Sequence, residues 1–179
     1  HGIEGETEDA AVLEDRSYTA KALLASLFLA NGTPMLLAGD EFGNTQYGNN
    51  NAYCQDNEIT WIKWANFNKE LFELTKQTIA ARKQIGSLNR NQWWSGDNVQ
   101  WLNIHGNQMT VDDWQNQQTK ALQVVLDKHC LLLINAKAEG QVFHLPDGKW
   151  TPQIGTHNLT LDAQQAELSS MGFCMLSDE

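Results

Sequence analysis

The second half of the chain, from about Asn91 onward, consists of short apolar runs separated by turn residues, and this pattern constrains the fold most strongly. The runs cover residues 99–104, 122–126, 130–135, 142–145, 150–154 and 172–176. Turn residues lie between them at Gly96-Asp97, Gly106-Asn107, Asp127-Lys128 and Pro146-Asp147-Gly148. Runs that recur about every ten residues with such turns are typical of antiparallel sheets. We therefore predict a small antiparallel β-sandwich over residues 89–179.

The first half has a different pattern of apolar residues, and two stretches of it show helical spacing. In the first stretch, the apolar residues are Leu23, Leu24, Leu27 and Phe28. This spacing predicts a helix over residues 16–30, with Asp15 or Ser17 as its cap. The pair Asn31-Gly32 is a stop signal. Residues 1–14 are rich in glycine and acidic side chains, and we expect an exposed loop there.

The second helical stretch extends to Gln84, and Gly86-Ser87 ends it. Asn66 or Asn68 is the predicted cap, because asparagine can accept a hydrogen bond from a backbone amide in the first turn. Apolar residues on one side and lysine, glutamate and arginine on the other predict a helix with one solvated face.

Between the two helices lies the apolar run 35–38, which Pro34 introduces and Gly39 closes. Such a run predicts a strand buried on both faces, as in parallel sheets. The residues after this run, up to Asn57, almost lack aliphatic side chains and are rich in Asn, Gln, Asp, Gly and Tyr. These side chains supply hydrogen-bond donors and acceptors together, as sugar hydroxyls do. Alpha/beta barrels place their ligand sites in loops of this kind.

The same stretch resembles a known family. The pattern Gly32-x-Pro34-x-x-x-x-Gly39-x-Glu41 is similar to that around the eighth barrel strand of the alpha-amylase superfamily of glycoside hydrolases. Residues 48–57, Gly-Asn-Asn-Asn-Ala-Tyr-Cys-Gln-Asp-Asn, followed by Thr60-Trp61-x-x-Trp64, are more specific. They resemble the isoamylase and glycogen debranching branch, most closely the debranching enzymes of bacterial glycogen operons. The resemblance extends more loosely over nearly the whole chain.

The length limits what this resemblance can imply. A complete alpha/beta barrel takes about 250 residues, which is more than the 179 residues of this chain. The resemblance therefore implies an α+β fragment. Residues 1–88 would be the last helix, strand and helix of an (α/β)8 barrel, which is incomplete here, and residues 89–179 the antiparallel C-terminal β-sandwich. The implied function is that of the C-terminal portion of an enzyme that hydrolyses alpha-1,6-glucosidic branch linkages in glycogen or limit dextrin.

No catalytic residue is assigned in this chain. Glycoside hydrolysis uses two carboxyl groups that flank the scissile bond. The resemblance places these groups and a third Asp after the fourth, fifth and seventh barrel strands, whereas this chain resembles only the region beyond the seventh strand. The adjacent pair Asp40-Glu41 matches a structural motif, and neighbouring side chains of an extended segment point apart. We therefore expect the isolated chain to be inactive.

The polar loop holds the candidate substrate-binding residues, which are Tyr53, Gln55, Asp56 and Asn57. They can hydrogen-bond to a glucan or stack on it near the cleft. The alternative is that the Asn and Asp side chains satisfy backbone groups of the loop itself. The sequence leaves both interpretations open.

Seven tryptophans are a high number for this length. An exposed indole can stack on a sugar, but tryptophan more often contributes buried surface. For Trp61, Trp64, Trp93 and Trp101 we expect packing between the barrel part and the sandwich rather than binding. Trp114 fits either role.

Composition excludes several classes of partner and site. The net charge of −10 disfavours nucleic acids and anionic membranes, since both attract basic patches. The three cysteines are widely spaced and form no CxxC pair, which indicates reduced thiols in a cytoplasmic protein. The five histidines are isolated from one another and from cysteine, so the sequence predicts neither a metal site nor a cofactor.

Two other functions stay open: a non-catalytic carbohydrate-binding or interaction module, and part of an isoamylase or pullulanase-type enzyme. A barrel end without its neighbours would leave apolar surface on the helix 16–30 and the strand 35–38. We expect this surface either to fold back on the sandwich or to pair with a second copy, so self-association is one expected outcome.

Overall fold

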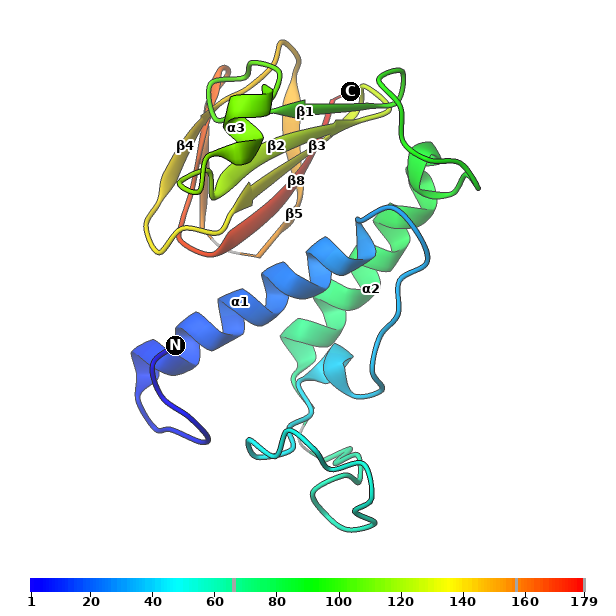
Figure 1. Cartoon of the computed structure of the whole chain (residues 1–179), viewed down its shortest axis with the longest axis vertical. Coiled ribbons are helices and arrows are strands. Elements are labelled where there is room, and N and C mark those ends of the chain that lie inside the picture. Colours follow the sequence, from blue (N-terminus) through cyan, green and yellow to red (C-terminus); the bar gives the residue numbers. More distant parts are fainter. Residues whose placement is uncertain (66, 157, 179) are drawn as a thin grey trace.

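The strand-rich half forms two antiparallel sheets (Figure 1). The computed structural model describes residues 1–65, 67–156 and 158–178. In these ranges, the larger sheet has the order β1-β2-β3-β8-β5 and the smaller sheet the order β4-β7-β6. The strands are β1 (Val99–Leu102), β2 (Ala121–Leu126), β3 (Cys130–Asn135), β4 (Gln141–His144), β5 (Trp150–Gly155), β6 (Leu159–Leu161), β7 (Gln165–Leu168) and β8 (Gly172–Asp178). The prediction of antiparallel sheets is confirmed.

A hydrophobic core separates the two sheets. Phe143 and Leu168 come from the smaller sheet, and Leu131, Trp150 and Leu176 come from the larger one. Because successive side chains of a strand point to opposite faces, only every second residue of β3 and β8 can reach this core. The remaining side chains of these two strands point to the outer face of the larger sheet.

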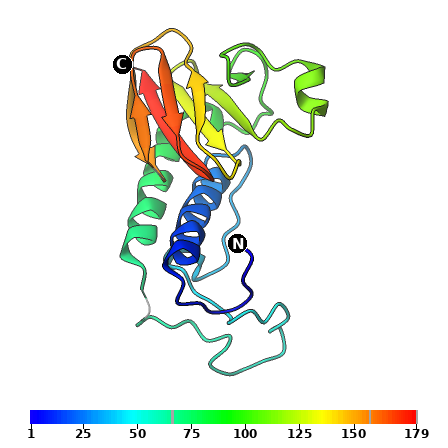
Figure 2. The same ribbon diagram turned by 90° about the vertical axis from the view of Figure 1, so that its left-hand side faces the viewer.

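That outer face is covered by the helical half of the chain. Leu132, Phe173 and Met175 pack there with Ala25 and Leu29 near the end of the first helix. Figures 1 and 2 show the two long helices beneath the larger sheet, on the side away from the smaller one. The runs 130–135 and 172–176 therefore lack polar alternation because both of their faces are buried. Folding back on the sheets is the first of the two outcomes expected for the apolar helix.

The first helix, α1 (Ala10–Phe28), begins six residues before the predicted start at residue 16. Its cap is Asp9, whose Oδ1 accepts from the amides of Ala11 at 3.0 Å and Val12 at 3.3 Å. The prediction of Asp15 or Ser17 as the cap is therefore wrong. Residues 10–14 contain good helix formers and no glycine or proline, so nothing stops the helix before it reaches Asp9.

The second long helix, α2 (Lys69–Gln84), begins and ends where predicted. Asn68 is the cap, and its Oδ1 accepts from the amide of Leu71 at 3.1 Å. The alternative cap, Asn66, lies outside the described residues. Leu24 and Phe28 of α1 pack against Leu71 of α2, so the two helices share their own small apolar contact.

The guanidinium of Arg82 joins the end of α1 to the segment that comes after α2. It donates to the carbonyl oxygens of Phe28 at 2.6 Å, Ala30 at 2.8 Å and Gly32 at 2.5 Å. It also donates to the carbonyl of Leu88 at 3.1 Å. Partial burial lowers the pKa of this guanidinium, which nevertheless stays protonated in proteins. One side chain thus fixes two segments that lie far apart in sequence.

The predicted strand at residues 35–38 does not form. Met35 is 88% exposed and Leu37 is 65% exposed, whereas Leu36 packs against the contact between α1 and α2. This alternation has the period of a strand, but a strand also needs a neighbour to pair with its backbone groups. Within the described ranges, no strand pairs with this segment, and this absence accounts for the difference.

Among the strands and α-helices, β6, β7 and the helix α3 (Val111–Gln115) were not predicted. In β7, only Ala166 and Leu168 point into the core, between exposed polar residues. The apolar signal is therefore too short to indicate a strand. Helix α3 begins with a capping box, in which the side chains of Thr110 and Asp113 each accept from the other residue's amide.

Candidate functional site

The polar loop after residue 38 lies at the end of the molecule away from the sheets (Figures 1 and 2). It leads into α2, whose first turn anchors it. Beside it, a cleft of about 990 Å³ separates the loop from the N-terminal segment. Glu6, Glu8 and Arg16 line one side of this cleft, and Thr45 and Tyr47 line the other.

A tight turn opens the loop. Gly39 has a φ of 103°, and a Cβ added there would lie 2.6 Å from the Cβ of Asn44. Oε2 of Glu41 accepts from the Gly39 amide at 2.8 Å. Phe42, which is 1% exposed, anchors the turn. The glycine and the glutamate of the sequence motif therefore shape this turn together, and only glycine fits at residue 39.

The carboxyl group of Asp40 has a raised pKa, because it is partly buried and lies near Glu41. The Glu41 carboxylate is engaged with the Gly39 amide. The Glu41 side chain thus stabilises the turn itself, as expected for a residue of a structural motif.

The four predicted substrate-binding residues lie together in one short segment of the loop but differ in availability. Tyr53 is 95% exposed. Oε1 of Gln55 accepts from Nδ2 of Asn49 at 3.1 Å. Oδ1 of Asn57 accepts from the amide of Ile59 at 3.0 Å. Both contacts stabilise the loop, and the contact of Asn57 with a backbone amide is the kind that the alternative interpretation expects for Asn side chains.

Asp56 has a different partner, which the sequence did not indicate. Its Oδ1 accepts from the indole Nε1 of Trp61 at 2.8 Å. Trp61 remains 57% exposed, so the carboxylate orients an indole ring whose surface stays open to solvent. Together with Tyr53, this pair presents aromatic and polar groups on one loop, and this combination can stack on a sugar ring and hydrogen-bond to its hydroxyls.

The packing expected for four of the tryptophans is found for only one of them. Trp101 packs against the core between the helices and the larger sheet. Trp61 and Trp64 lie in the loop, far from the sheets. Trp64 is 70% exposed, although the centroid of its ring lies 5.4 Å from that of Phe42. Trp93 is 90% exposed. For these three residues the expectation of packing between the two halves is wrong. Trp114 stays 52% exposed beside Trp101.

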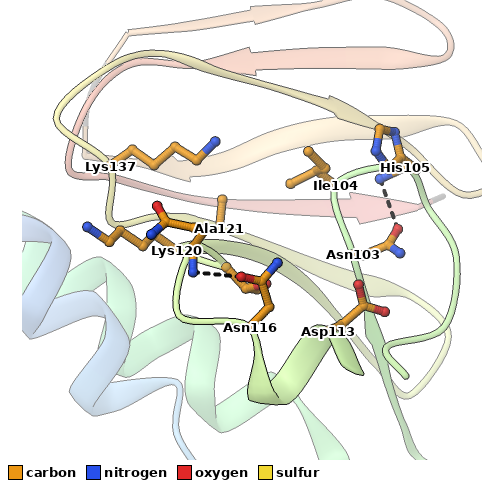
Figure 3. A pocket seen from close by; sticks show the side chains of 10 residues that line it. Asn103, Ile104, His105, Asp113, Asn116, Lys120, Ala121 and Lys137 are labelled. Atoms are coloured by element: carbon orange, nitrogen blue, oxygen red, sulfur yellow. Dashed lines mark hydrogen bonds between the residues drawn. The ribbon is translucent and has the colours of Figure 1, made fainter. Parts of the chain in front are cut away.

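The strand-rich half has a polar pocket of its own, with a volume of about 210 Å³. Figure 3 shows Asn103, His105, Asp113, Asn116 and Lys137 around it. Several of these groups already have partners: Nζ of Lys137 donates to Oε1 of Gln141 at 2.6 Å. Hydrogen bonds from Thr110 lower the pKa of Asp113. The side chains of Lys137 and Asp113 are therefore already engaged with other residues of the chain.

Two further observations concern metal-binding groups and the two buried thiols. In the part of the chain that the structure describes, no group of three or more His, Cys, Asp and Glu side chains is placed to hold a metal ion. Burial raises the pKa of the Cys130 and Cys174 thiols to about 12, which leaves them protonated and poorly reactive. None of the helices in the described ranges combines the length and the hydropathy that crossing a membrane requires.

Comparison with known proteins finds similar sequences and folds. A family model described as the glycogen debranching enzyme C-terminal domain matches residues 94–168. The glycogen operon protein GlgX homolog of Haemophilus influenzae is 77% identical over 185 residues, which cover 100% of this chain and 28% of that protein. The glycogen debranching enzyme of Klebsiella pneumoniae is 49% identical over 152 residues, which cover 84% of this chain and 23% of that protein.

A solved structure shows the same fold. The pullulanase from Bacillus acidopullulyticus matches with a TM-score of 0.71 and 20% identity, over 97% of this chain and 21% of that one. The chain spans less than a third of the length of the two curated relatives. Residues 94–168 are thus similar to the C-terminal domain of glycogen debranching enzymes, and the whole chain is similar to about a quarter of the length of those proteins.

Proposed function

We infer that this chain is the C-terminal portion of a glycogen debranching enzyme. The whole enzyme would hydrolyse alpha-1,6-glucosidic branch linkages in glycogen or limit dextrin. The observation that carries this inference is the high identity to a glycogen operon protein along the entire chain. The free state of all three cysteines supports action in a reducing compartment such as the cytoplasm.

In this proposal, residues 1–88 complete a catalytic barrel and residues 89–179 form the C-terminal sandwich. Support for the barrel comes from a groove of about 320 Å³ between α1 and the segment after it, lined by Leu23, Leu27 and Leu36. Leu23 is 66% exposed, and Met35 and Leu37 are also open to solvent. A preceding barrel strand that pairs with residues 33–38 would cover these side chains and satisfy the backbone groups beside them.

The loop would then lie at the rim of the active-site cleft, because barrel enzymes carry their sites on loops at the ends of the strands. Tyr53 and the Asp56–Trp61 pair are the groups proposed to touch the glucan. Gln55 and Asn57 would hold the loop in shape. The acid/base carboxyl group and the nucleophile that hydrolysis needs would come from the rest of the enzyme.

The isolated chain is therefore expected to release no reducing ends from glycogen limit dextrin. A reducing-sugar assay on the purified chain tests this, with the full-length enzyme as the positive control. Turnover that persists through purification and disappears when a residue of this chain is mutated would contradict the assignment of the carboxyl groups to another part of the enzyme.

In the full-length enzyme, Asp56→Ala is expected to lower kcat/KM on limit dextrin by about tenfold, a barrier change of about 1.4 kcal/mol. The reason is that the Trp61 indole loses the acceptor that orients it. Asp56→Asn keeps an acceptor oxygen and should retain most of the activity. The melting temperature should change little, since Asp56 is exposed.

Asp97→Ala is the matched control, because Asp97 is an exposed aspartate in a turn of the other half. Full activity of Asp56→Ala, or a loss of activity that only accompanies a loss of stability, would show that the loop residue is structural.

A further inference from the structure

Another pocket lies at the opposite end of the two long helices from the loop. Its volume is about 220 Å³. It is lined by Asn31, Gly32, Arg90, Asn91, Gln92 and Trp93. The lining thus combines one large aromatic ring with three amide side chains and a guanidinium, and it includes no carboxylate. In a chain with a net charge of −10, a surface pocket without an acidic side chain is a local exception.

The walls of this pocket are fixed by hydrogen bonds. Arg82 holds the carbonyl of Gly32 on one side and that of Leu88 on the other. Nδ2 of Asn89 donates to the carbonyls of Arg82 at 2.9 Å and Ile85 at 2.9 Å. Residues 88 and 89 are therefore anchored immediately before the pocket residues.

The other end of the segment is also anchored. The indole Nε1 of Trp94 donates to the carbonyl of Ser87 at 3.3 Å, and the Trp94 ring packs against Trp101 with centroids 5.7 Å apart. Residues 90–93 thus form a short loop held at both ends. A loop that is already ordered loses little conformational entropy when it binds a ligand.

The exposed side chain of Trp93 is the main indication that this pocket binds a ligand. It is 90% exposed, whereas its neighbour Trp94 is partly buried against the core. An exposed indole leaves a large apolar area in water, and the surrounding amides offer donors and acceptors in the same place. A ligand with apolar ring faces and hydroxyl edges satisfies both kinds of group, and this is the chemistry of a saccharide.

The pocket is separate from the candidate substrate loop. The loop leads into the start of α2, whereas Arg90 comes after its end (Figure 1). Helix α2 has 16 residues, which at a rise of 1.5 Å per residue span roughly 24 Å. A single glucose ring cannot touch both places, although a glucan chain or a branched particle can.

We propose that the pocket of Asn31, Arg90, Asn91, Gln92 and Trp93 is a second glucan-binding site, which anchors a branched alpha-glucan away from the cleft. The choice of an alpha-glucan among saccharides rests on the proposed function. The Trp93 ring stacks on a glucose unit, while the amides and the guanidinium hydrogen-bond to its hydroxyls. The site holds a large particle near the enzyme and takes no part in bond cleavage.

The test is affinity electrophoresis of the 179-residue chain in gels that contain glycogen, with maltoheptaose as the soluble competitor. Trp93→Ala should weaken retardation by about tenfold, as expected for the loss of an aromatic stacking contact. Trp93→Phe keeps a ring face and should recover part of the binding. Gln92→Ala removes a hydrogen-bonding group and should weaken binding to a smaller extent.

Two controls separate this site from the others. Trp114→Ala removes an exposed indole from the strand-rich half and should leave retardation unchanged. Tyr53→Ala tests the candidate substrate loop in the same gel. Melting temperatures of all variants should match that of the unmodified chain, since Trp93, Gln92 and Tyr53 are exposed.

The results distinguish the two proposals. Loss of retardation with Trp93→Ala but not with Tyr53→Ala supports the second site, even if the loop role fails. Loss with Tyr53→Ala alone overturns the second site and leaves the loop role intact. No retardation of the unmodified chain also overturns the second site, while the debranching assignment would still rest on the activity of the full-length enzyme.

Discussion

Phe173→Ala is expected to lower the free energy of unfolding by about 3–5 kcal/mol, the range for removing a large aromatic side chain from a core. Phe173 is 1% exposed and packs between the larger sheet and the helices. The backbone around it cannot collapse into the space left behind. The Phe173 amide donates to Oγ1 of Thr156 at 2.8 Å, and the Phe173 carbonyl accepts from the same hydroxyl at 2.9 Å.

Urea unfolding followed by far-ultraviolet circular dichroism measures this change. Val142→Ala is the control, because Val142 is a strand residue that is 41% exposed, and it should cost well under about 1 kcal/mol. A Phe173 variant as stable as the Val142 variant would mean that the helices do not depend on the sheet for their packing.

Arg82→Met is expected to cost about 2–4 kcal/mol, since hydrogen bonds to a charged group contribute about 1.5–3 kcal/mol each and are not additive. The methionine keeps most of the apolar stem but removes the donors to the carbonyls of Phe28, Ala30, Gly32 and Leu88. Arg82→Lys restores the charge without the planar fork, so it should recover only part of the stability.

Lys83→Met is the matched control for this experiment, because Lys83 is the exposed neighbour on the same helix. Equal unfolding curves for the Arg82 and Lys83 variants would show that the four carbonyls find other partners, and the bridge between the two segments would then contribute nothing measurable.

The sequence predicted the elements whose signals are local. Asn68 caps α2 as expected, because an asparagine before a helical pattern accepts a first-turn amide regardless of the rest of the fold. The runs 130–135 and 172–176 were identified as strands, because consecutive apolar residues indicate burial. Helices α1 and α2 cover the outer face of these strands. This packing depends on contacts between segments that lie far apart in the sequence, and no local pattern reveals it.

Elements that depend on a neighbour were predicted less well. Residues 35–38 have the composition of a buried strand but no partner in the described ranges, so composition alone gave the wrong result. The start of α1 was placed too late because glycine and acidic residues before Asp9 suggested a loop that extended to residue 14. Strands β6 and β7 were missed because their inward side chains are few.

In the candidate site, too, the sequence predicted the features with a local signal and missed those that depend on the fold. The loop was identified from its polar composition, and its four candidate residues do lie together. The roles of Asp56 and Trp61 became visible only in the structure, because their hydrogen bond depends on how the loop turns. The exposure of Trp93 had no signal in the sequence, since its neighbour Trp94 has the same side chain and is partly buried.

The shared core of the helices and the larger sheet has a consequence for how such proteins can diverge. Ala25, Leu29 and Phe173 contribute to one cluster although they come from opposite ends of the chain. A genetic exchange that replaced only the strand-rich half would join helices to a sheet surface that had not been selected with them. The two halves should therefore be inherited as one unit, and substitutions on the outer face of β3 and β8 should covary with those on α1.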